Sequence, residues 1–163
     1  MTVTLFALLY PVRSQIALLY ERESAIYDCG YYIINSIMLT LTLLEQTFTL
    51  HRLEPDAELP APALHSPFFA IMRTADETSL VLPESIEIES DKSNVGWACF
   101  KVEGPLDFSL VGILARIANV LTETQVSIFA LSTFDTDYIL VKREQVQAAK
   151  EALRAAGYSV KGS

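Results

Sequence analysis

The stretch from residue 97 to residue 138 most constrains the fold, because strand, loop, helix and turn patterns follow one another there with almost no spacer. After an apolar run and a Gly-Pro loop, apolar side chains recur at steps of three and four residues, the period of an amphipathic helix. Asp107 or Ser109 is placed to cap its first turn. The apolar positions are Leu110, Ile113, Leu114, Ile117 and Leu121.

The residues that follow complete this pattern. Apolar runs at 126–131 and 138–142 are bounded by turn residues and are typical of strands covered on at least one face. A second amphipathic helix is marked by Val146, Ala149 and Leu153, and Gly157 is placed to end it before a short strand at 158–160. The order β-α-β-β-α-β predicts an α+β fold of the ferredoxin-like type over residues 95–161, with both helices on one face of an antiparallel sheet.

The part from residue 38 to residue 92 is predicted to be mainly β. Apolar and polar residues alternate over 39–51, and a four-proline stretch at 55–67 indicates a loop. Two short strands at 68–73 and 79–82 are spaced like a hairpin, and Pro83 ends the second. The polar residues 90–94 suggest a boundary between two subdomains.

Residues 1–37 do not share these patterns, because their apolar runs keep neither a helix nor a strand period. They also lack a basic leader and about 20 consecutive apolar residues, so neither a signal peptide nor a membrane span is expected. Two hypotheses remain open. Either Met38 is the natural start and residues 1–37 are an upstream extension, or they form an N-terminal helical appendage.

Composition excludes several classes of function. The formal net charge of −8 and the absence of a Lys/Arg block argue against a nucleic-acid partner. With only His51 and His65, and no paired cysteine or histidine motif, no metal site is predicted. Cys29 and Cys99 lie far apart, and a buried Cys99 thiol in a reducing, cytoplasmic compartment is favoured over a disulfide.

Two segments carry chemistry that could bind a ligand. Gly104 in the loop before the helix permits close approach of a ligand, and the free N–H groups at the helix start attract a carboxylate. Asp135 and Asp137 in the acidic turn could hold an ammonium or guanidinium group. Each segment also has an ordinary structural interpretation, as a strand-to-helix connection and as a turn, and both interpretations stay open.

An enzymatic role is disfavoured. Asp135 and Asp137 could act as an acid and base pair, but no nucleophile, general base or oxyanion motif accompanies them. Ser132 has no histidine in the same subdomain. We therefore expect no catalytic residue, and nothing in the sequence calls for a cofactor.

The same residues resemble a known family. KVEGPLDFSLVGILARIANVL followed by VSIFALSTFDTDYILVK is similar to bacterial ACT domain proteins related to the cytosolic arginine sensors, which are built from tandem ACT modules. The upstream LTLLEQTFTLHRL and FFAIMRTADETSLVLPE resemble the degenerate first module of such proteins. The resemblance implies a degenerate, mainly β ACT-like module at 38–92 before the ACT module at 95–161.

The resemblance further implies a non-catalytic regulatory or sensor module that binds an amino acid at the interface between its ACT modules, as a homodimer. The alternative is a module that has lost ligand binding and only pairs with a partner protein. Carried over from the family, the implied ligand-binding residues are Ser79, Leu80, Gly104, Phe108, Ser109, Gly112, Thr133, Asp135 and Asp137. The identity of the amino acid stays open.

Overall fold

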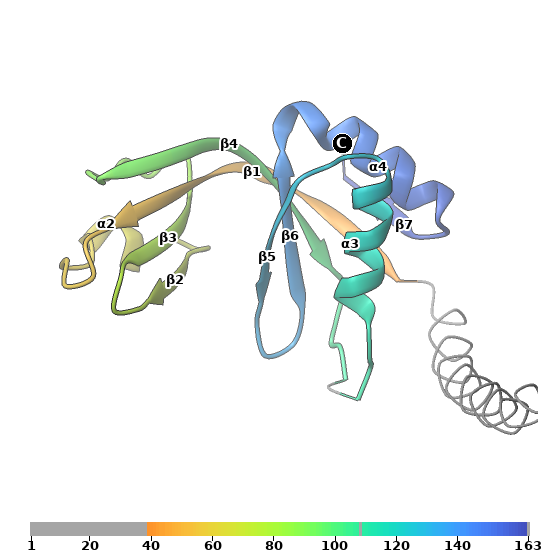
Figure 1. Cartoon of the computed structure of the whole chain (residues 1–163), viewed down its shortest axis with the longest axis horizontal. Coiled ribbons are helices and arrows are strands. Elements are labelled where there is room, and N and C mark those ends of the chain that lie inside the picture. The colour runs from red at the N-terminus through yellow and green to blue at the C-terminus, as the bar shows by residue number, and fades with distance from the viewer. Residues whose placement is uncertain (1–38, 108, 163) are drawn as a thin grey trace, which may run out of the picture. The chain divides into compact units, whose positions relative to one another are not determined.

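The computed structural model describes residues 39–107 and 109–162, which belong to one compact unit of the chain, residues 38–163 (Figure 1). The predictions for residues 1–37, for Cys29 and for Phe108 lie outside the described residues. Within the described residues, the strands and helices follow one another in the predicted order.

The second half of the chain has the predicted β-α-β-β-α-β order, and the α+β, ferredoxin-like fold class is confirmed. The first strand starts five residues earlier than the pattern from Trp97 indicated, within the polar stretch expected to mark a boundary. The elements are β4 (Lys92–Val102), α3 (Ile113–Glu123), β5 (Ile128–Ser132), β6 (Asp137–Lys142), a 3-10 turn (Arg143–Gln145), α4 (Val146–Ala155) and β7 (Ser159–Lys161).

The first half is mainly β, as predicted. It consists of β1 (Thr40–Leu53), the short helix α2 (Ala61–Leu64), β2 (Ala70–Arg73) and β3 (Thr78–Pro83). The hairpin between β2 and β3 is confirmed, with the Thr74 N–H donating to the Glu77 carbonyl at 2.9 Å. The proline-rich stretch is not wholly a loop, because Pro60 sets an extended backbone before a single helical turn over α2.

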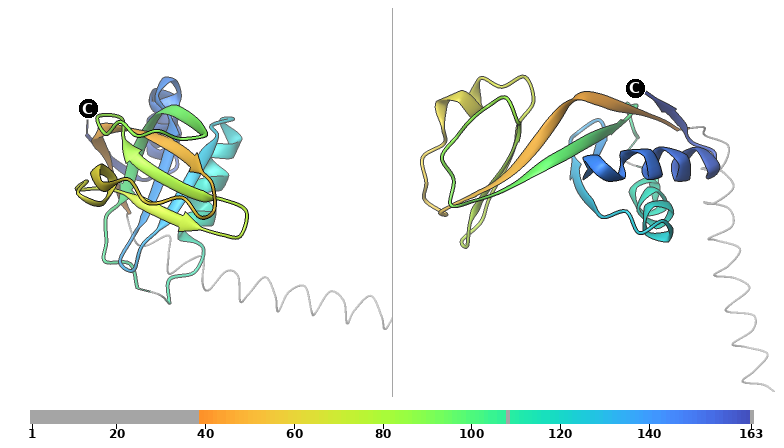
Figure 2. Two further views of the ribbon diagram at one scale, coloured as in Figure 1. Left: turned by 90° about the vertical axis from the view of Figure 1, so that its left-hand side faces the viewer. Right: turned by 90° about the horizontal axis from the view of Figure 1, so that it is seen from above.

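One sheet joins the two halves. Its strand order is β2-β3-β1-β4-β6-β5, and β7 pairs with β1. β1 and β4 form a long antiparallel pair that runs from one half to the other (Figure 2). The first residues of β1 lie between β4 and β7, with Leu41 paired to Val102 on one side and to Val160 on the other. A strand from the first half therefore completes the sheet of the second half.

Helices α3 and α4 cover one face of this sheet and enclose its main core. Leu41, Phe100, Ile117, Ile139 and Leu153 are fully buried there. The helical spacing in the sequence predicted the contribution of α3. The contribution of β1 was not predicted, because alternation along a strand does not reveal which strands lie beside it.

Two smaller clusters fill the rest of the fold. Phe48, Val81, Trp97, Cys99 and Leu140 form one on the sheet face opposite the helices, and burial raises the pKa of the Cys99 thiol to about 12. The other consists of Leu53, Ala63, Leu80 and Leu82 beneath α2. The predicted burial of Cys99 is confirmed, and such a thiol is not reactive at neutral pH.

The predicted cap of the first helix is wrong. The helix starts at Ile113 after Gly112, which adopts φ of 81° as the N-cap residue, so neither Asp107 nor Ser109 reaches its first turn. Instead the Ser109 N–H donates to the Asp107 carboxylate at 2.8 Å within a turn before the helix. At the other helix the prediction is confirmed, since Gly157 follows α4 with φ of 90°.

His51 gives the fold an expected acid sensitivity. Its side chain is buried, Nδ1 lies 3.1 Å from the Ser90 hydroxyl, and Nε2 has no hydrogen-bond partner among the described residues. Burial lowers its pKa below the ordinary 6.5, so the folded protein holds His51 neutral while the unfolded chain protonates. We expect this contribution to stability to be complete above pH 6.5 and to be lost progressively as the pH falls toward the folded-state pKa. Urea unfolding at pH 8 and pH 5 measures it.

His51→Gln provides the comparison for this prediction. Glutamine does not titrate, so the variant should lose less stability between pH 8 and pH 5 than the parent protein does. An equal loss in both proteins would show that other groups cause the acid sensitivity.

Candidate functional site

The structure brings the loop before α3 and the acidic turn between β5 and β6 into direct contact. The Leu106 N–H donates to the Asp135 carbonyl at 2.8 Å, and the Thr136 hydroxyl donates to the Val102 carbonyl at the end of β4. Gly104 is required at this contact, because a Cβ there would lie 2.6 Å from the Asp135 carbonyl oxygen. The two segments that carried chemistry in the sequence thus lie at the same end of the sheet.

The acidic turn is held by its own hydrogen bonds. The Thr133 N–H and hydroxyl both donate to the Thr136 carbonyl, at 2.8 and 3.0 Å. The Ser132 hydroxyl donates to the Asp137 carboxylate at 2.6 Å. These contacts fix the backbone of the turn and orient one of its two carboxylates.

A hollow of about 270 Å³, here called the acidic hollow, lies between this turn and the start of α3. It contains three carboxylates and, among its described lining residues, no Lys, Arg or His. The Ser109 side chain and then its backbone N–H, by hydrogen bonding, lower the pKa of Asp107, so this group stays ionised. The lining residues are Leu106, Asp107, Leu110, Ile113, Leu114, Ser132, Thr133, Phe134, Asp135, Thr136 and Asp137.

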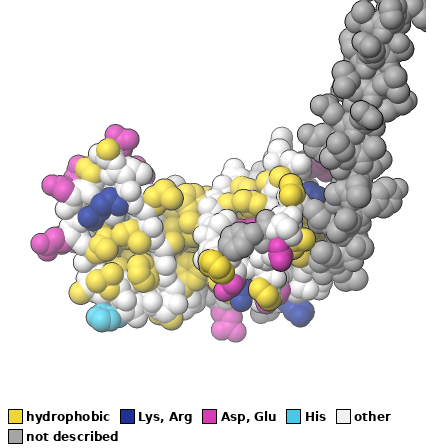
Figure 3. All heavy atoms as spheres, turned by 90° about the horizontal axis from the view of Figure 1, so that it is seen from below, with side chains coloured by type: hydrophobic (Ala, Val, Ile, Leu, Met, Phe, Trp, Pro, Cys, Tyr) yellow, Lys and Arg dark blue, Asp and Glu magenta, His cyan; other side chains and the backbone are white. Residues whose placement is uncertain are grey.

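A second hollow of about 510 Å³, here called the apolar hollow, lies between the β2–β3 hairpin and the β5–β6 hairpin. Hydrophobic side chains are gathered on one face of the molecule in Figure 3. Most of the hollow is lined by aromatic and aliphatic groups. The lining residues are Ser66, Pro67, Phe68, Phe69, Ala70, Ile71, Met72, Ser79, Val81, Phe129, Ala130, Leu131, Ser132, Thr133 and Tyr138.

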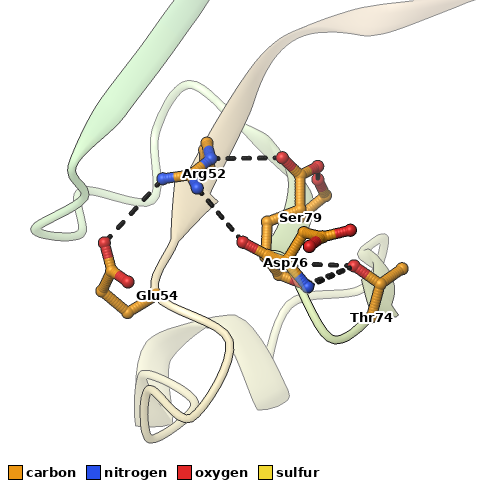
Figure 4. A network of polar contacts seen from close by, with 6 residues as sticks. Arg52, Glu54, Thr74, Asp76 and Ser79 are labelled. Atoms are coloured by element: carbon orange, nitrogen blue, oxygen red, sulfur yellow. Dashed lines mark hydrogen bonds and ion pairs between the residues drawn. The ribbon is translucent and has the colours of Figure 1, made fainter.

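The two hollows meet at Ser132 and Thr133, which line both. Across the apolar hollow from them lies Ser79, whose position is fixed by a polar network (Figure 4). Its hydroxyl donates to the Glu77 carboxylate at 2.5 Å, and the Arg52 guanidinium donates to the same carboxylate at 3.2 Å. The turn of the first hairpin is therefore anchored to β1.

The implied binding residues fall into three groups. Thr133, Asp135 and Asp137 line the acidic hollow, and Ser79 and Thr133 line the apolar one. Gly104, Ser109 and Gly112 shape the loop and the helix start without lining either hollow, and Phe108 lies outside the described residues. Leu80 lies on the opposite side of β3 in the cluster beneath α2, so its side chain points away from both hollows.

Several lining residues were not singled out in the sequence. Asp107 was considered only as a helix cap, and Phe68, Phe129 and Tyr138 only as core or strand residues. Phe129 and Leu131 alternate along β5 and so share one face of that strand. No local pattern shows that this face lies near β2 and β3, the far end of the strand order.

Other kinds of site find no support in the described part of the chain. It contains no group of three His, Cys, Asp or Glu residues arranged to hold a metal ion. Within 39–107 and 109–162 there is likewise no helix long and apolar enough to cross a membrane.

Comparison with known proteins agrees with this fold. The ACT domain family matches residues 92–155, which span β4 to the end of α4. A protein of known structure from Agrobacterium tumefaciens is 33% identical, with a TM-score of 0.70 over 76% of this chain and 92% of that one. The regulatory subunit of aspartate kinase from Thermus thermophilus has the same fold, with a TM-score of 0.52, 14% identity and coverage of 71% and 95% of the two chains.

A curated relative, the cytosolic arginine sensor for mTORC1 subunit 1 from Rattus norvegicus, is 28% identical over 123 residues. The match covers 69% of this chain but only 37% of the relative, so the chain corresponds to little more than a third of that sensor. Fold and comparisons together define an ACT domain protein. More specifically, the chain belongs to the tandem ACT domain proteins related to the cytosolic arginine sensors.

Proposed function

We propose that the chain is a regulatory module that binds a free amino acid and has no catalytic activity of its own. The observation that carries this proposal is the acidic hollow, where three carboxylates lie beside the start of α3. A free amino acid is a zwitterion, so its ammonium group complements these carboxylates and its carboxylate complements the N–H groups at the start of α3. The relationship to an arginine sensor and the shared fold with a regulatory subunit of aspartate kinase support a regulatory role.

In this proposal the ligand ammonium binds the carboxylates of Asp135 and Asp137 through charge-assisted hydrogen bonds. The ligand carboxylate binds the first N–H groups of α3, at Ile113 and Leu114, which have no acceptor within the helix. Both residues line the acidic hollow. Because Ser132 and Thr133 also line the apolar hollow, which contains Ser79, a ligand bound in this way would reach the interface between the two modules.

The proposal includes a cytoplasmic homodimer. Strands β2 and β5 each pair with a single neighbour in the described sheet, so each leaves one edge open. A second copy of the chain would cover such an edge. Sedimentation velocity of the full chain measures this state directly.

Amino-acid binding predicts thermal stabilisation. When the full chain is incubated with each standard amino acid at millimolar concentration, at least one should raise the melting temperature. A ligand at about 100 times its Kd adds about 2.7 kcal/mol to the free energy of unfolding. No shift across the whole set would favour the interaction-only alternative.

Asp137→Asn tests the ammonium contact. It retains an acceptor for Ser132 but removes the charge, so we expect the ligand-induced shift to fall sharply while the melting temperature without ligand changes little. Glu123→Gln, which removes an exposed carboxylate at the far end of α3, is the matched control and should retain the full shift.

A further inference from the structure

We infer that the ligand of this site is an amino acid with a large apolar side chain, and that the apolar hollow is the pocket for that side chain. The inference rests on the proposed function, because it assigns the specificity of the same site. It follows from the chemistry of the hollow, from its size and from its position beside the acidic hollow.

The apolar hollow offers no charged partner to a ligand. Its described lining contains no Asp, Glu, Lys, Arg or His. Five of its lining residues carry a hydroxyl group, the fifth being Tyr138. The other four already donate within the protein, Ser66 to the Phe68 carbonyl, Ser79 to Glu77, Ser132 to Asp137 and Thr133 to the Thr136 carbonyl. A polar side chain entering this hollow would lose water without gaining a donor from those four hydroxyls.

Packed aromatic rings form the inner part of the hollow. The Phe68 ring lies 4.7 Å from that of Phe48 and 5.3 Å from that of Tyr138, centroid to centroid, the second in an edge-to-face arrangement. Phe48 is fully buried beneath them. Because these rings support one another, the hollow is a preformed surface for an aliphatic or aromatic group.

Size and position match a side chain that extends from the acidic hollow. The acidic hollow, about 270 Å³, is smaller than the 300 to 1,000 Å³ typical of small-molecule sites, whereas the apolar hollow, about 510 Å³, falls within that range. Both contain Ser132 and Thr133. An amino acid whose ammonium contacts Asp137 can therefore direct its side chain past these two residues.

A cationic side chain does not suit this arrangement. The carboxylates line the acidic hollow, where the ammonium group binds, and none lines the apolar hollow. A guanidinium there would be desolvated without an anion to pair with it. We therefore expect leucine, methionine and phenylalanine to bind more tightly than arginine and lysine.

Calorimetric titration of the full chain with leucine, alanine and arginine tests the preference. Leucine should bind roughly sixtyfold more tightly than alanine, because each of its three additional carbons contributes about a fourfold gain when buried. Tighter binding of arginine than of leucine would overturn this inference and leave amino-acid binding intact. If none of the three amino acids bound, both the side-chain preference and the proposed amino-acid binding would be overturned.

Two substitutions locate the pocket. Met72→Glu places a charge at the rim of the hollow on a side chain that is 68% exposed, and should weaken leucine binding about tenfold or more. Leu64→Glu, at a 49% exposed position on α2 outside both hollows, is the matched control and should leave binding unchanged.

Ala70→Leu fills part of the hollow from β2 and should weaken leucine binding while sparing alanine, provided that its melting temperature confirms a folded protein. Leucine binding that is unaffected by both Met72→Glu and Ala70→Leu would show that the side chain lies elsewhere.

Discussion

Leu41→Ala is expected to destabilise the ACT module by roughly 2 to 5 kcal/mol. This loss is as large as that expected for a buried residue replaced by alanine in α3 or α4. Leu41 belongs to β1, more than fifty residues before the ACT domain match begins, yet it is fully buried in the core beneath α3 and α4. Its strand neighbours there are Val102 and Val160. Removing the Leu41 side chain opens a cavity in this core. No other side chain of β1 can fill that cavity unless the strand moves.

Urea unfolding monitored by circular dichroism measures this effect. Ile117→Ala, also fully buried but on α3, is the comparator, and the two losses should be of similar size. Leu64→Ala, at an exposed position, should change the free energy of unfolding by less than about 0.5 kcal/mol. If Leu41→Ala lowered the free energy of unfolding no more than Leu64→Ala does, β1 would not contribute to the stability of the ACT sheet.

This dependence on β1 marks the limit of what the sequence can predict. Helix α3, the β2–β3 hairpin and the end of α4 at Gly157 follow from periodicity and turn chemistry, which are properties of neighbouring residues. Insertion of β1 between β4 and β7 joins segments that are more than fifty residues apart in the chain, with Thr40 paired to Ser159 and Leu41 to Val102. No local pattern specifies such a pairing.

The candidate site divides in the same way. Asp135, Asp137 and Thr133 could be named from their own turn, because their side-chain chemistry is visible in the sequence. The apolar hollow could not, since its walls come from β2 and β5, the two ends of the strand order. Only the curvature of one sheet brings Met72 and Leu131 to the same hollow. The specificity of the site therefore depends on the part of the fold that sequence patterns describe least.

Gly104→Ala should have a large effect on both stability and ligand binding. The added Cβ would lie 2.6 Å from the Asp135 carbonyl oxygen, so the loop and the acidic turn must separate. That movement breaks the 2.8 Å hydrogen bond from the Leu106 N–H to the same carbonyl. We expect a loss of roughly 1 to 3 kcal/mol in the free energy of unfolding from the steric clash. Because the acidic hollow lies between these segments, amino-acid affinity should fall by about tenfold or more.

Gly96→Ala separates the two effects. Gly96 lies on β4 outside both hollows and adopts φ of 78°, with no atom near the position of an added Cβ. Alanine there would therefore be strained only in its backbone, at a cost of roughly 1 to 2 kcal/mol. It should lower stability while leaving affinity unchanged. If Gly104→Ala also left affinity unchanged, the contact between Leu106 and Asp135 would not shape the binding site, and the ammonium and carboxylate contacts proposed for its two walls would be wrong.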